Sequence, residues 1–320
     1  MTKCRICGSG SITRVGQVEY YIDYRMPVYD CGSCGCRFTR HHDEVYDVLY
    51  SEEDSLYYLD IANRCRALFD QGDDVVLKAA LCQNTKFRFI IDSLEHEPRS
   101  ARILEMGCSR GHLSSYFILQ QHDFLGVDIS QSAVKFANTT FGEHFAVSGD
   151  PRIVARAPYD VIYHTGMIGC VADPLGITRE MLSLLRPGGR LLFNAPNRNA
   201  CVLRDQLWVD AGPPPDLITL FPPHFWRTRF GDSAQVTEGH EYRAPADNLA
   251  IALRRLAGQR WKCPSPMEFR ESLRARADKR RYLPRVTNLA LRIASAVGIA
   301  GLAPAQPAEF GLTVSMMKNA

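Results

Sequence analysis

Two carboxylates near the middle of the chain each follow a short apolar run, and glycines lie between them. Glu105 follows the first run and Asp128 follows the second, while Gly107 and Gly111 form a turn that leads into a helical stretch. A strand, a glycine turn, a helix and a strand with a terminal acid make up the first half of a nucleotide-binding α/β fold. The glycines let the backbone pass close to a ligand, and the terminal acid suits a ribose diol.

The residues in and beside this turn indicate which nucleotide it would bind. A dinucleotide fingerprint needs glycine where this chain has Ser109 and His112, and no G-x-x-x-x-G-K-[ST] phosphate loop occurs in the sequence. Glu105 would repel a pyrophosphate, but it suits a ligand that carries an ammonium and a sulfonium. S-adenosylmethionine carries both groups, so the pattern predicts this ligand. A strand, turn and helix without any ligand is the competing interpretation, and acids at two successive strand ends argue against it.

Further motifs occur in the order and spacing of a known family. They are Glu105-x-Gly107-x-x-x-Gly111, Asp128, Asp150 and the later Leu185-Arg-Pro-Gly-Gly-Arg190. Together they resemble the class I S-adenosylmethionine-dependent methyltransferases over roughly residues 86–199. The resemblance implies an α/β, Rossmann-like sheet of seven strands with the last one antiparallel, and S-adenosylmethionine as cofactor. Ser109 replaces the middle glycine of the family's loop, which predicts a slightly altered loop that still binds the cofactor.

The ends of the expected strands supply the candidate cofactor contacts. Asp150 follows the expected third strand, His144–Ser148, and can accept a hydrogen bond from the adenine amine, while Ile129 can pack on the adenine face. Asp150 as the N-cap of a helix is the competing interpretation, and both roles can hold together. The full set of candidate cofactor contacts is Glu105, Gly107, Cys108, Ser109, Gly111, Asp128, Ile129, Asp150, His164 and Thr165.

Two histidines are candidate bases for the transfer. The reaction is an in-line displacement with a neutral leaving group, so the protein mostly aligns the acceptor and excludes water. His164 lies near the end of the expected strand Tyr159–Thr165, and His224 lies beside Trp226, a flat aromatic that suits a sugar. A lone histidine on a strand end is more often structural, and His224 and Trp226 can equally pack their loop. The Glu-His pair that many relatives place after this strand is absent, because Gly169-Cys170 stands at those positions.

Two C-x-x-C-G knuckles at the N-terminus predict a metal site. Cys4 and Cys7 form the first pair, and Cys31 and Cys34 form the second, on either side of a strand-like stretch, Gln17–Tyr29. Four thiolates at this spacing make a closed tetrahedral zinc site, a zinc ribbon, with no open position for water. We therefore expect structural Zn²⁺ that contributes folding energy. The possible substitute ligands, which we interpret as bystanders, are Cys36, His41 and His42.

The ribbon by itself leaves the acceptor open. Zinc ribbons also occur in ribosomal RNA methyltransferases, but acidic and basic side chains are mixed along this one, and it forms no basic stripe for phosphates. Nucleic acid is therefore a disfavoured partner that stays possible. A ribbon before such a core also resembles bacterial enzymes of sugar, glycan and natural-product biosynthesis. Members that C-methylate keto-sugars carry a further C-terminal domain for which this chain looks too short.

The predicted organisation has three parts. Residues 1–42 form the ribbon, residues 43–97 form linker and lid helices, and residues 98–320 form the methyltransferase core with a helical insertion at about 243–306. In the linker, Tyr57 or Tyr58 could face the ligand, or the aromatics could pack the ribbon onto the core. The arginine-rich insertion favours a solvated basic face, with peripheral attraction to anionic lipid as the sharper alternative.

The remaining elements follow from periodicity and turn residues. The expected helices are Val75–Leu94, Leu113–Gln120, Gln131–Thr139 with Ser130 as N-cap, and Pro174–Leu185, and the expected later strands are Leu191–Asn194, Gln235–Tyr242 and Phe310–Lys318. Ligands gather at the carboxyl edge of an open α/β sheet. We therefore expect Asn194, Asn197 and Asn199, which follow the fifth strand, to face the acceptor.

Composition narrows the class of protein. The chain has 320 residues, an apolar share of 46% and a formal net charge of +3, which provides no global electrostatic footprint for nucleic acid. Eleven cysteines without a secretory signal indicate reduced thiols and metal ligands, hence a cytoplasmic protein. The longest apolar segment, Leu289–Ala303, is interrupted by Arg292 and is too short to span a membrane.

The sequence therefore predicts a zinc-ribbon methyltransferase that acts on a small molecule or glycan, with a hydroxyl as the first choice of acceptor. N- or C-methylation follows behind. The alternatives are an RNA methyltransferase that grips RNA with its ribbon, and a degenerate methyltransferase fold that serves as a partner-binding module. The sequence leaves the oligomeric state open.

Overall fold

The computed structural model describes residues 2–21, 24–40, 59–202, 207–209, 217–241 and 311–319. The candidate ligands His41 and His42, the tyrosines proposed as a lid and the insertion at 243–306 lie outside these ranges. Predictions made for those residues stay predictions. None of the helices in the described ranges is long and apolar enough to cross a membrane.

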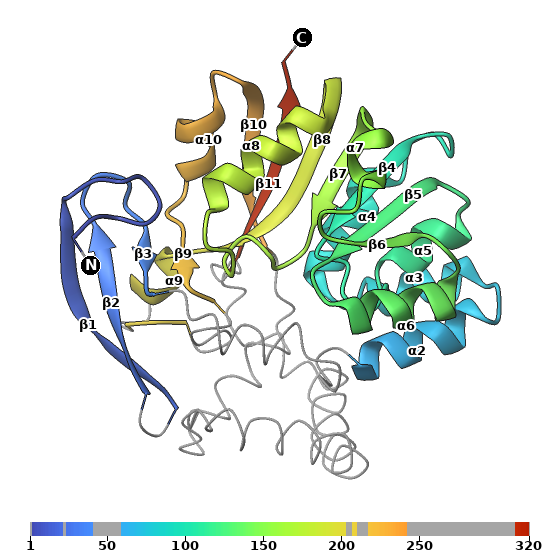
Figure 1. Ribbon diagram of the computed structural model, residues 1–320, viewed down its shortest axis with the longest axis horizontal. Coiled ribbons are helices and arrows are strands. Elements are labelled where there is room, and N and C mark those ends of the chain that lie inside the picture. Colours follow the sequence, from blue (N-terminus) through green and yellow to red (C-terminus); the bar gives the residue numbers. More distant parts are fainter. Residues whose placement is uncertain are drawn as a thin grey trace, which may run out of the picture.

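The main sheet has seven strands and is Rossmann-like (Figure 1). In spatial order the strands are β10 (Ala234–His240), β11 (Gly311–Lys318), β8 (Leu185–Pro196), β7 (Tyr159–His164), β4 (Arg102–Met106), β5 (Asp123–Asp128) and β6 (Phe145–Val147). The strands from β8 to β6 pair in parallel, whereas β11 is antiparallel to both β8 and β10. This confirms the predicted fold class, including the antiparallel last strand.

Helices cover both faces of this sheet, as the buried apolar runs of its parallel strands require. One face packs against α2 (Leu59–Phe69), α3 (Asp74–Leu81), α4 (Thr85–Leu94), α5 (Ser114–Leu119) and α6 (Gln131–Phe141). The other packs against α8 (Pro174–Leu184) and α10 (Phe225–Phe230). Two further short helices are α7 (Arg152–Ala155) and α9 (Asn199–Val202).

Side-chain caps set several of the helix boundaries. The Ser130 hydroxyl accepts from the Ala133 N–H, which confirms it as the N-cap of α6, and Asp173 caps α8 in the same way. The single helix predicted over 75–94 is wrong, because the chain breaks between α3 and α4. At this break the Asn84 side chain accepts from the Lys86 N–H at 3.0 Å and begins a new helix. The cap at Asn84 therefore ends one helix and begins another, although apolar residues recur at helical spacing across this point.

The N-terminal part forms a second, four-stranded sheet. Its strands, in spatial order, are β1 (Ile12–Tyr21), β2 (Tyr24–Cys31), β3 (Arg37–Phe38) and β9 (Thr219–Leu220). The strand-like stretch predicted over 17–29 is therefore divided between the two arms of an antiparallel hairpin. The edge strand β9 comes from the methyltransferase part of the sequence, between β8 and β10, and pairs with β3. Figure 1 shows this small sheet beside the main one.

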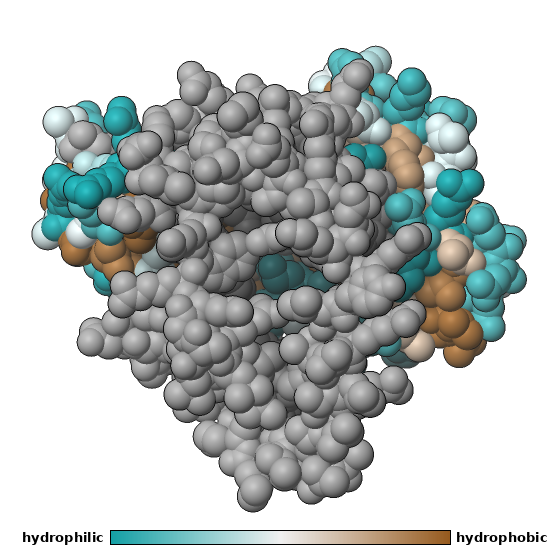
Figure 2. All heavy atoms as spheres, turned by 90° about the horizontal axis from the view of Figure 1, so that it is seen from below, coloured by the Kyte–Doolittle hydropathy of each residue, from teal (hydrophilic) through white to brown (hydrophobic). Residues whose placement is uncertain are grey.

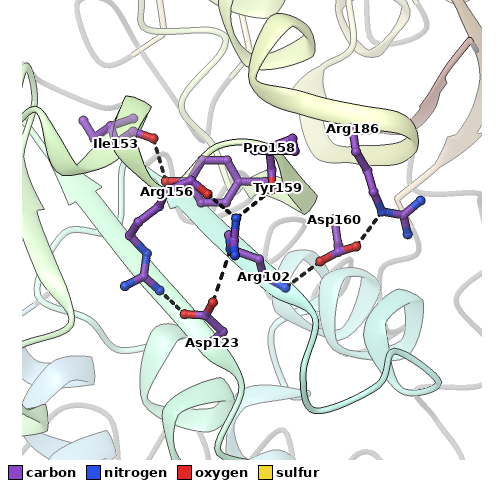
Figure 3. A network of polar contacts seen from close by, with 8 residues as sticks. All are labelled: Arg102, Asp123, Ile153, Arg156, Pro158, Tyr159, Asp160 and Arg186. Atoms are coloured by element: carbon purple, nitrogen blue, oxygen red, sulfur yellow. Dashed lines mark hydrogen bonds and ion pairs between the residues drawn. The ribbon is translucent and has the colours of Figure 1, made fainter.

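The amino ends of the parallel strands are joined by a polar network (Figure 3). The Arg102 side chain, at the start of β4, reaches Asp123 at the start of β5, and Arg156 also bonds to Asp123. Asp160, near the start of β7, accepts from the Arg102 backbone N–H at 2.8 Å and from the Arg186 Nε at 2.5 Å. The ends of the same strands that carry Glu105 and Asp128 lie at the opposite edge.

Candidate functional site

The glycine turn after β4 has three residues with left-handed backbone conformations. Their φ angles are +72° at Gly107, +50° at Ser109 and +74° at Gly111. A Cβ on Gly111 would lie 2.8 Å from Cζ of Phe145, so this position admits glycine alone on steric grounds as well. Ser109 thus keeps the backbone form that glycine would favour there, at a strain of about 1 kcal/mol.

Glu105, at the end of β4, is an acid buried to 2% exposure. Its carboxylate accepts from the Ser114 hydroxyl at 2.5 Å and from the Tyr163 hydroxyl at 3.0 Å. The pKa of Glu105 is raised to about 7, mainly by burial; the hydroxyls of Ser114 and Tyr163 oppose this rise, and the nearby Asp128 adds to it. A carboxyl group with this pKa changes charge close to neutral pH, so a cationic ligand beside it would favour the ionised form.

Asp128, at the end of the neighbouring strand β5, is held by backbone amides. Its carboxylate accepts from the Ser109 N–H at 2.7 Å and from the Ser130 N–H at 2.9 Å. Burial raises the pKa of Asp128 although these amides lower it. Ile129, directly after it, is a large apolar side chain that is 42% exposed. The structure thus brings Glu105, the glycine turn, Asp128 and Ile129 together at one edge of the sheet.

Three other predicted contacts lie around this group. The Asp150 carboxylate, after β6, accepts from the Arg152 N–H at 2.8 Å and pairs with its guanidinium at 3.1 Å. The predicted N-cap role of Asp150 is wrong, because the N-cap of α7 is Pro151 and Asp150 lies one residue before it. An adenine contact of Asp150 stays a prediction. Cys108 is 1% exposed, and its N–H donates to the Val127 carbonyl, so its contribution to a ligand site would come through the backbone. Thr165 follows β7 and is partly exposed.

His164 lies inside the core at the end of β7. It is fully buried, its ring stacks on Phe193 with centroids 4.8 Å apart, and neither ring nitrogen has a hydrogen-bond partner among the described residues. Burial lowers its pKa to about 3, which leaves the imidazole neutral and a weak base at neutral pH. These surroundings favour the structural role that competed with catalysis in the sequence interpretation.

His224 is exposed and lies just before α10, with a left-handed φ of +66°. Its backbone N–H donates to the Glu238 carboxylate at 2.5 Å. Trp226, by contrast, is completely buried and packs edge-on against Phe193 with ring centroids 4.9 Å apart. Trp226 therefore packs its loop and is not an acceptor contact, whereas the proposed role of His224 as a base stays a prediction.

Buried amides with unused hydrogen-bonding groups lie at the carboxyl end of β8. Asn194 is 2% exposed, and neither its Oδ1 nor its Nδ2 has a partner among the described residues; Nδ2 of Asn197 is in the same state. An unmet buried amide costs about 1–3 kcal/mol. Figure 2 views the molecule from this side of the sheet and shows hydrophilic residues near the centre of the face. These amides are suited to bonds with a polar ligand.

The four knuckle cysteines converge as the spacing predicts. Their sulfurs all lie within 4.8 Å of one another, with Cys4 and Cys34 3.8 Å apart and Cys7 and Cys31 3.6 Å apart. A tetrahedron with Zn–S bonds of about 2.3 Å has edges of about 3.8 Å, so the cluster fits the ion. The N–H of Ile6 donates to the Cys4 sulfur at 3.4 Å. The set would hold Zn²⁺ through four thiolates.

The chemistry of the thiols agrees with this geometry. A hydrogen bond with Cys34 and burial raise the pKa of Cys4 to about 12, because both favour the protonated thiol. A divalent ion offsets this preference by binding the deprotonated sulfurs. Cys36 is buried but does not belong to the described cluster, in agreement with its interpretation as a bystander.

Sequence reasoning missed the side chains that hold the acids in place. Ser114 and Tyr163 are ordinary helix and strand residues in the sequence, and nothing in their spacing marks them as partners of Glu105. Tyr163 could have been found only from the strand order, since β7 is the parallel neighbour of β4 and Glu105 pairs with Tyr163 in register.

Comparison with known proteins assigns the family. A family model described as a methyltransferase domain matches residues 77–237, half of the chain. The chain belongs to this methyltransferase-domain family. Similar proteins include ubiquinone biosynthesis O-methyltransferases of Bordetella pertussis and Xylella fastidiosa (strain 9a5c), both 33% identical over 106 residues and 31% of this chain. The match spans 44% and 43% of those two proteins, less than half of their length.

Solved structures with a similar fold are more distant from this methyltransferase-domain protein. The plantazolicin methyltransferase BpumL, solved with a substrate analogue and SAH, is 13% identical at a TM-score of 0.42, over 87% of this chain and 98% of that one. A SAM-dependent methyltransferase from Archaeoglobus fulgidus is 14% identical at a TM-score of 0.43, over 77% and 95%. At these values the similarity carries no conclusion about substrate.

Proposed function

We propose that this protein transfers a methyl group from S-adenosylmethionine to a hydroxyl of a small molecule or glycan. The observation that carries the proposal is the pair of acids at the ends of adjoining strands on either side of the left-handed turn, the buried Glu105 and the partly exposed Asp128. Burial raises the pKa of both acids, and Asp128 also raises that of Glu105; when ionised, the two carboxylates attract the ammonium and sulfonium of this donor and repel a pyrophosphate. Membership of the methyltransferase-domain family supports the same conclusion.

The chain's own residues would bind and orient the reactants. The bound donor supplies an electrophilic methyl group on a cationic sulfur. Asp128 suits the ribose hydroxyls because each carboxylate oxygen that accepts an amide keeps a second lone pair. The exposed Ile129 offers an apolar surface for adenine. Alignment and the exclusion of water then supply most of the acceleration.

A hydroxyl acceptor is our first choice for two reasons. The similar proteins from Bordetella and Xylella are named O-methyltransferases. In addition, the unmet amides of Asn194 and Asn197 offer both donors and acceptors to a polar molecule at the carboxyl edge of the sheet. Of the two histidines proposed as bases, His224 is the exposed one, so it is the better candidate.

We further propose that the cysteine cluster holds Zn²⁺ in a structural role. Four protein ligands leave no position for a reacting water. Reduced thiolates are required for this site, and a cytoplasmic location would keep them reduced.

Calorimetric titration tests the donor. We expect S-adenosylhomocysteine and S-adenosylmethionine to bind the purified protein at micromolar concentrations, and the Asp128→Asn variant to lose at least tenfold in affinity. Asp92→Asn, an exposed change away from the turn, is the matched control. Binding of NAD with no response to either adenosyl compound would overturn the assignment.

An acceptor panel tests the second half of the proposal. Methyl transfer from labelled donor is measured to nucleotide-sugars, glycans, phenols and structured RNA, and we expect label in the first three classes as a methyl ether. Steep salt-dependent retention on heparin, together with label only in RNA, would instead support the RNA alternative.

A further inference from the structure

Arg5, which lies between Cys4 and Cys7 in the first knuckle, makes side-chain hydrogen bonds to the methyltransferase part of the chain. Its Nη2 donates to the carbonyls of Val171 at 2.7 Å and Ala172 at 2.8 Å. Its Nη1 donates to the Thr219 hydroxyl at 2.7 Å. The arginine therefore bonds at once to the loop after β7 and to the strand β9.

The second knuckle makes a similar connection through Asp30, which immediately precedes Cys31. Its carboxylate accepts from Nη2 of Arg198 at 2.8 Å and from Nε of Arg37 at 2.7 Å. Arg198 belongs to the loop after β8, and its backbone N–H donates to the Phe221 carbonyl at 2.8 Å. Each knuckle thus has a charged neighbour that holds one loop at the carboxyl edge of the main sheet.

The loop held by Arg5 also touches the proposed donor site. Met167, in this loop, lies so close to the glycine turn that a Cβ on Gly107 would meet its sulfur at 3.3 Å. Further along, the Gly169 carbonyl accepts from the Ile218 N–H at 2.8 Å, and a Cβ on Gly169 would meet Pro196 at 2.5 Å. The loop is therefore closely packed between the ribbon side and the glycine turn.

The loop held by Arg198 leads away from the unmet amides of Asn194 and Asn197. A displacement of either loop would therefore move groups at the proposed acceptor position. Glu105 and Asp128, in contrast, lie on strands to which neither knuckle makes a hydrogen bond among the described residues. The proposed acceptor position is therefore connected to the knuckles by hydrogen bonds through its loops, whereas the two acids of the proposed donor site are not.

The metal controls whether these connections are rigid. The first knuckle is a tight turn in which the Gly8 N–H donates to the Cys4 carbonyl at 2.9 Å, and the Gly35 N–H donates to the Cys31 carbonyl in the second. These backbone bonds shape each knuckle, and a common ion would join the two knuckles through all four thiolates, because metal binding and folding are coupled in such small sites. A guanidinium holds its partner in a fixed orientation, because its planar group donates two N–H groups to two acceptors at once.

We propose that the ribbon positions the two acceptor-side loops of the methyltransferase core, with Arg5 and Asp30 as positioning residues, so that metal loading controls acceptor binding more strongly than donor binding. This inference rests on the proposed methyl transfer for its functional meaning, but its structural content is independent of activity.

Hydrogen exchange measured by mass spectrometry on the full chain tests the proposal. Five samples are compared: the zinc-loaded protein, the protein after chelation, and the loaded variants Arg5→Ala, Asp30→Asn and Arg14→Ala. Arg14 lies on β1, is exposed, and its guanidinium donates to the Gln17 side chain within the same strand, so it is the control for loss of a ribbon arginine. Zinc content and circular dichroism establish that each loaded variant is folded.

We expect exchange in residues 166–173 to rise at least tenfold in Arg5→Ala, and exchange in residues 197–202 to rise likewise in Asp30→Asn. Chelation should raise both, and Arg14→Ala should raise neither. Peptides that contain Glu105 and Asp128 should keep their protection, and the dissociation constant of S-adenosylhomocysteine should stay within about twofold. With a competent acceptor, KM for that acceptor should rise about tenfold in Arg5→Ala, with a smaller change in kcat.

Unchanged protection of residues 166–173 in folded, zinc-loaded Arg5→Ala would overturn the proposal, as would equal loosening of the donor-site peptides. Failure of the methyltransferase assignment would appear differently, as an absence of S-adenosylhomocysteine binding in the unaltered chain. Arg5→Lys separates position from charge, since it keeps the cation but loses the fork, and we expect an intermediate effect on loop exchange.

Discussion

A carboxyl group that titrates near neutral pH is the most informative single residue of the candidate site. Glu105 is buried beside a second acid, and only two hydroxyls stabilise its charge. Its folded-state pKa of about 7 is above the value of about 4.3 for an unfolded chain. The ligand-free protein therefore loses stability from this group as the pH rises from about 4.3 through 7, because the folded state holds the proton more tightly.

The first prediction concerns the pH dependence of donor binding. A cationic donor favours ionised Glu105, so affinity for S-adenosylmethionine should rise by up to about tenfold between pH 6 and 8, when the proton no longer has to be displaced. Calorimetry across this range measures it. Glu105→Gln should bind more weakly and lose the dependence; an equally steep profile in this variant would assign the titration to another group.

The second prediction concerns the glycine turn. Gly111→Ala should destabilise the fold by about 2–4 kcal/mol, because the new Cβ meets the Phe145 ring and the backbone φ is left-handed. Ser109→Gly should change the free energy of unfolding by less than about 1 kcal/mol, since relief of strain and added unfolded-state entropy oppose each other. Urea unfolding compares the two. Equal effects would show that steric contact at Gly111 does not matter.

For individual residues, the sequence predicted the positions of those whose role depends on backbone conformation or on charge. Asp128 and the turn glycines lie together as expected because strand ends in a parallel sheet meet at one edge. The burial of His164 could not be predicted, because the local sequence at a strand end does not show whether the histidine ring faces solvent or packs on another side chain such as Phe193. The burial of Trp226 escaped prediction for the same reason.

Strands and helices have their own stabilising contacts at the edge away from the site. In the network of Figure 3, Asp160 ties the start of β7 to the first residue of β4 and to Arg186. Burial alone would raise the pKa of Asp160, but the Arg102 amide and the Arg186 guanidinium lower it overall. Asp160 therefore stabilises the fold above the unfolded pKa of about 3.9, and this contribution is lost as the pH falls through the folded value.

The third prediction follows from that sign. Asp160→Asn should reduce the free energy of unfolding by about 1 kcal/mol at pH 7, with a smaller difference at pH 3, because the native carboxyl takes up its proton as the pH falls through its lowered pKa. Urea titrations at both pH values measure the change, and exposed Asp92→Asn is the control. A loss of the same size at pH 3 would mean that packing, not charge, is responsible. Donor affinity should be unaffected, because the network lies at the opposite edge.

Elements were predictable where their signals are local. The cap Ser130 and the antiparallel last strand implied by the resemblance both appear in the structure. The break at Asn84 was missed because apolar periodicity continues across it. The strand β9 was beyond local reasoning, since only its two residues pair with the ribbon and they lie far along the chain from β3.

The whole molecule has a shared core between its two sheets. Ribbon residues such as Ile6 and Phe38 belong to the same buried apolar cluster as Phe193 and Trp226 of the methyltransferase part. Packing of this kind makes independent unfolding of the two parts unfavourable, because separation would expose the aromatic side chains.

The fourth prediction is that removal of the metal affects the stability of the entire protein. Chelation should lower the midpoint of a single thermal transition by about 10 °C, since loss of a tightly bound ion from the native state costs several kcal/mol. Differential scanning calorimetry with and without added Zn²⁺ measures it, and Cys4→Ser should behave as the chelated protein does. Two transitions, of which the larger ignores zinc, would contradict a shared core.

The pairing of β3 with β9 has a practical consequence for protein engineering. A ribbon cut out at its C-terminal boundary would leave behind the strand Thr219–Leu220 and with it the hydrogen bonds that complete the sheet edge. A chimera built by grafting residues 1–42 onto another methyltransferase would therefore expose the unpaired backbone N–H and C=O groups of β3 and aggregate. Successful transplantation needs a recipient that offers an equivalent strand, so the exchangeable unit is discontinuous along the chain.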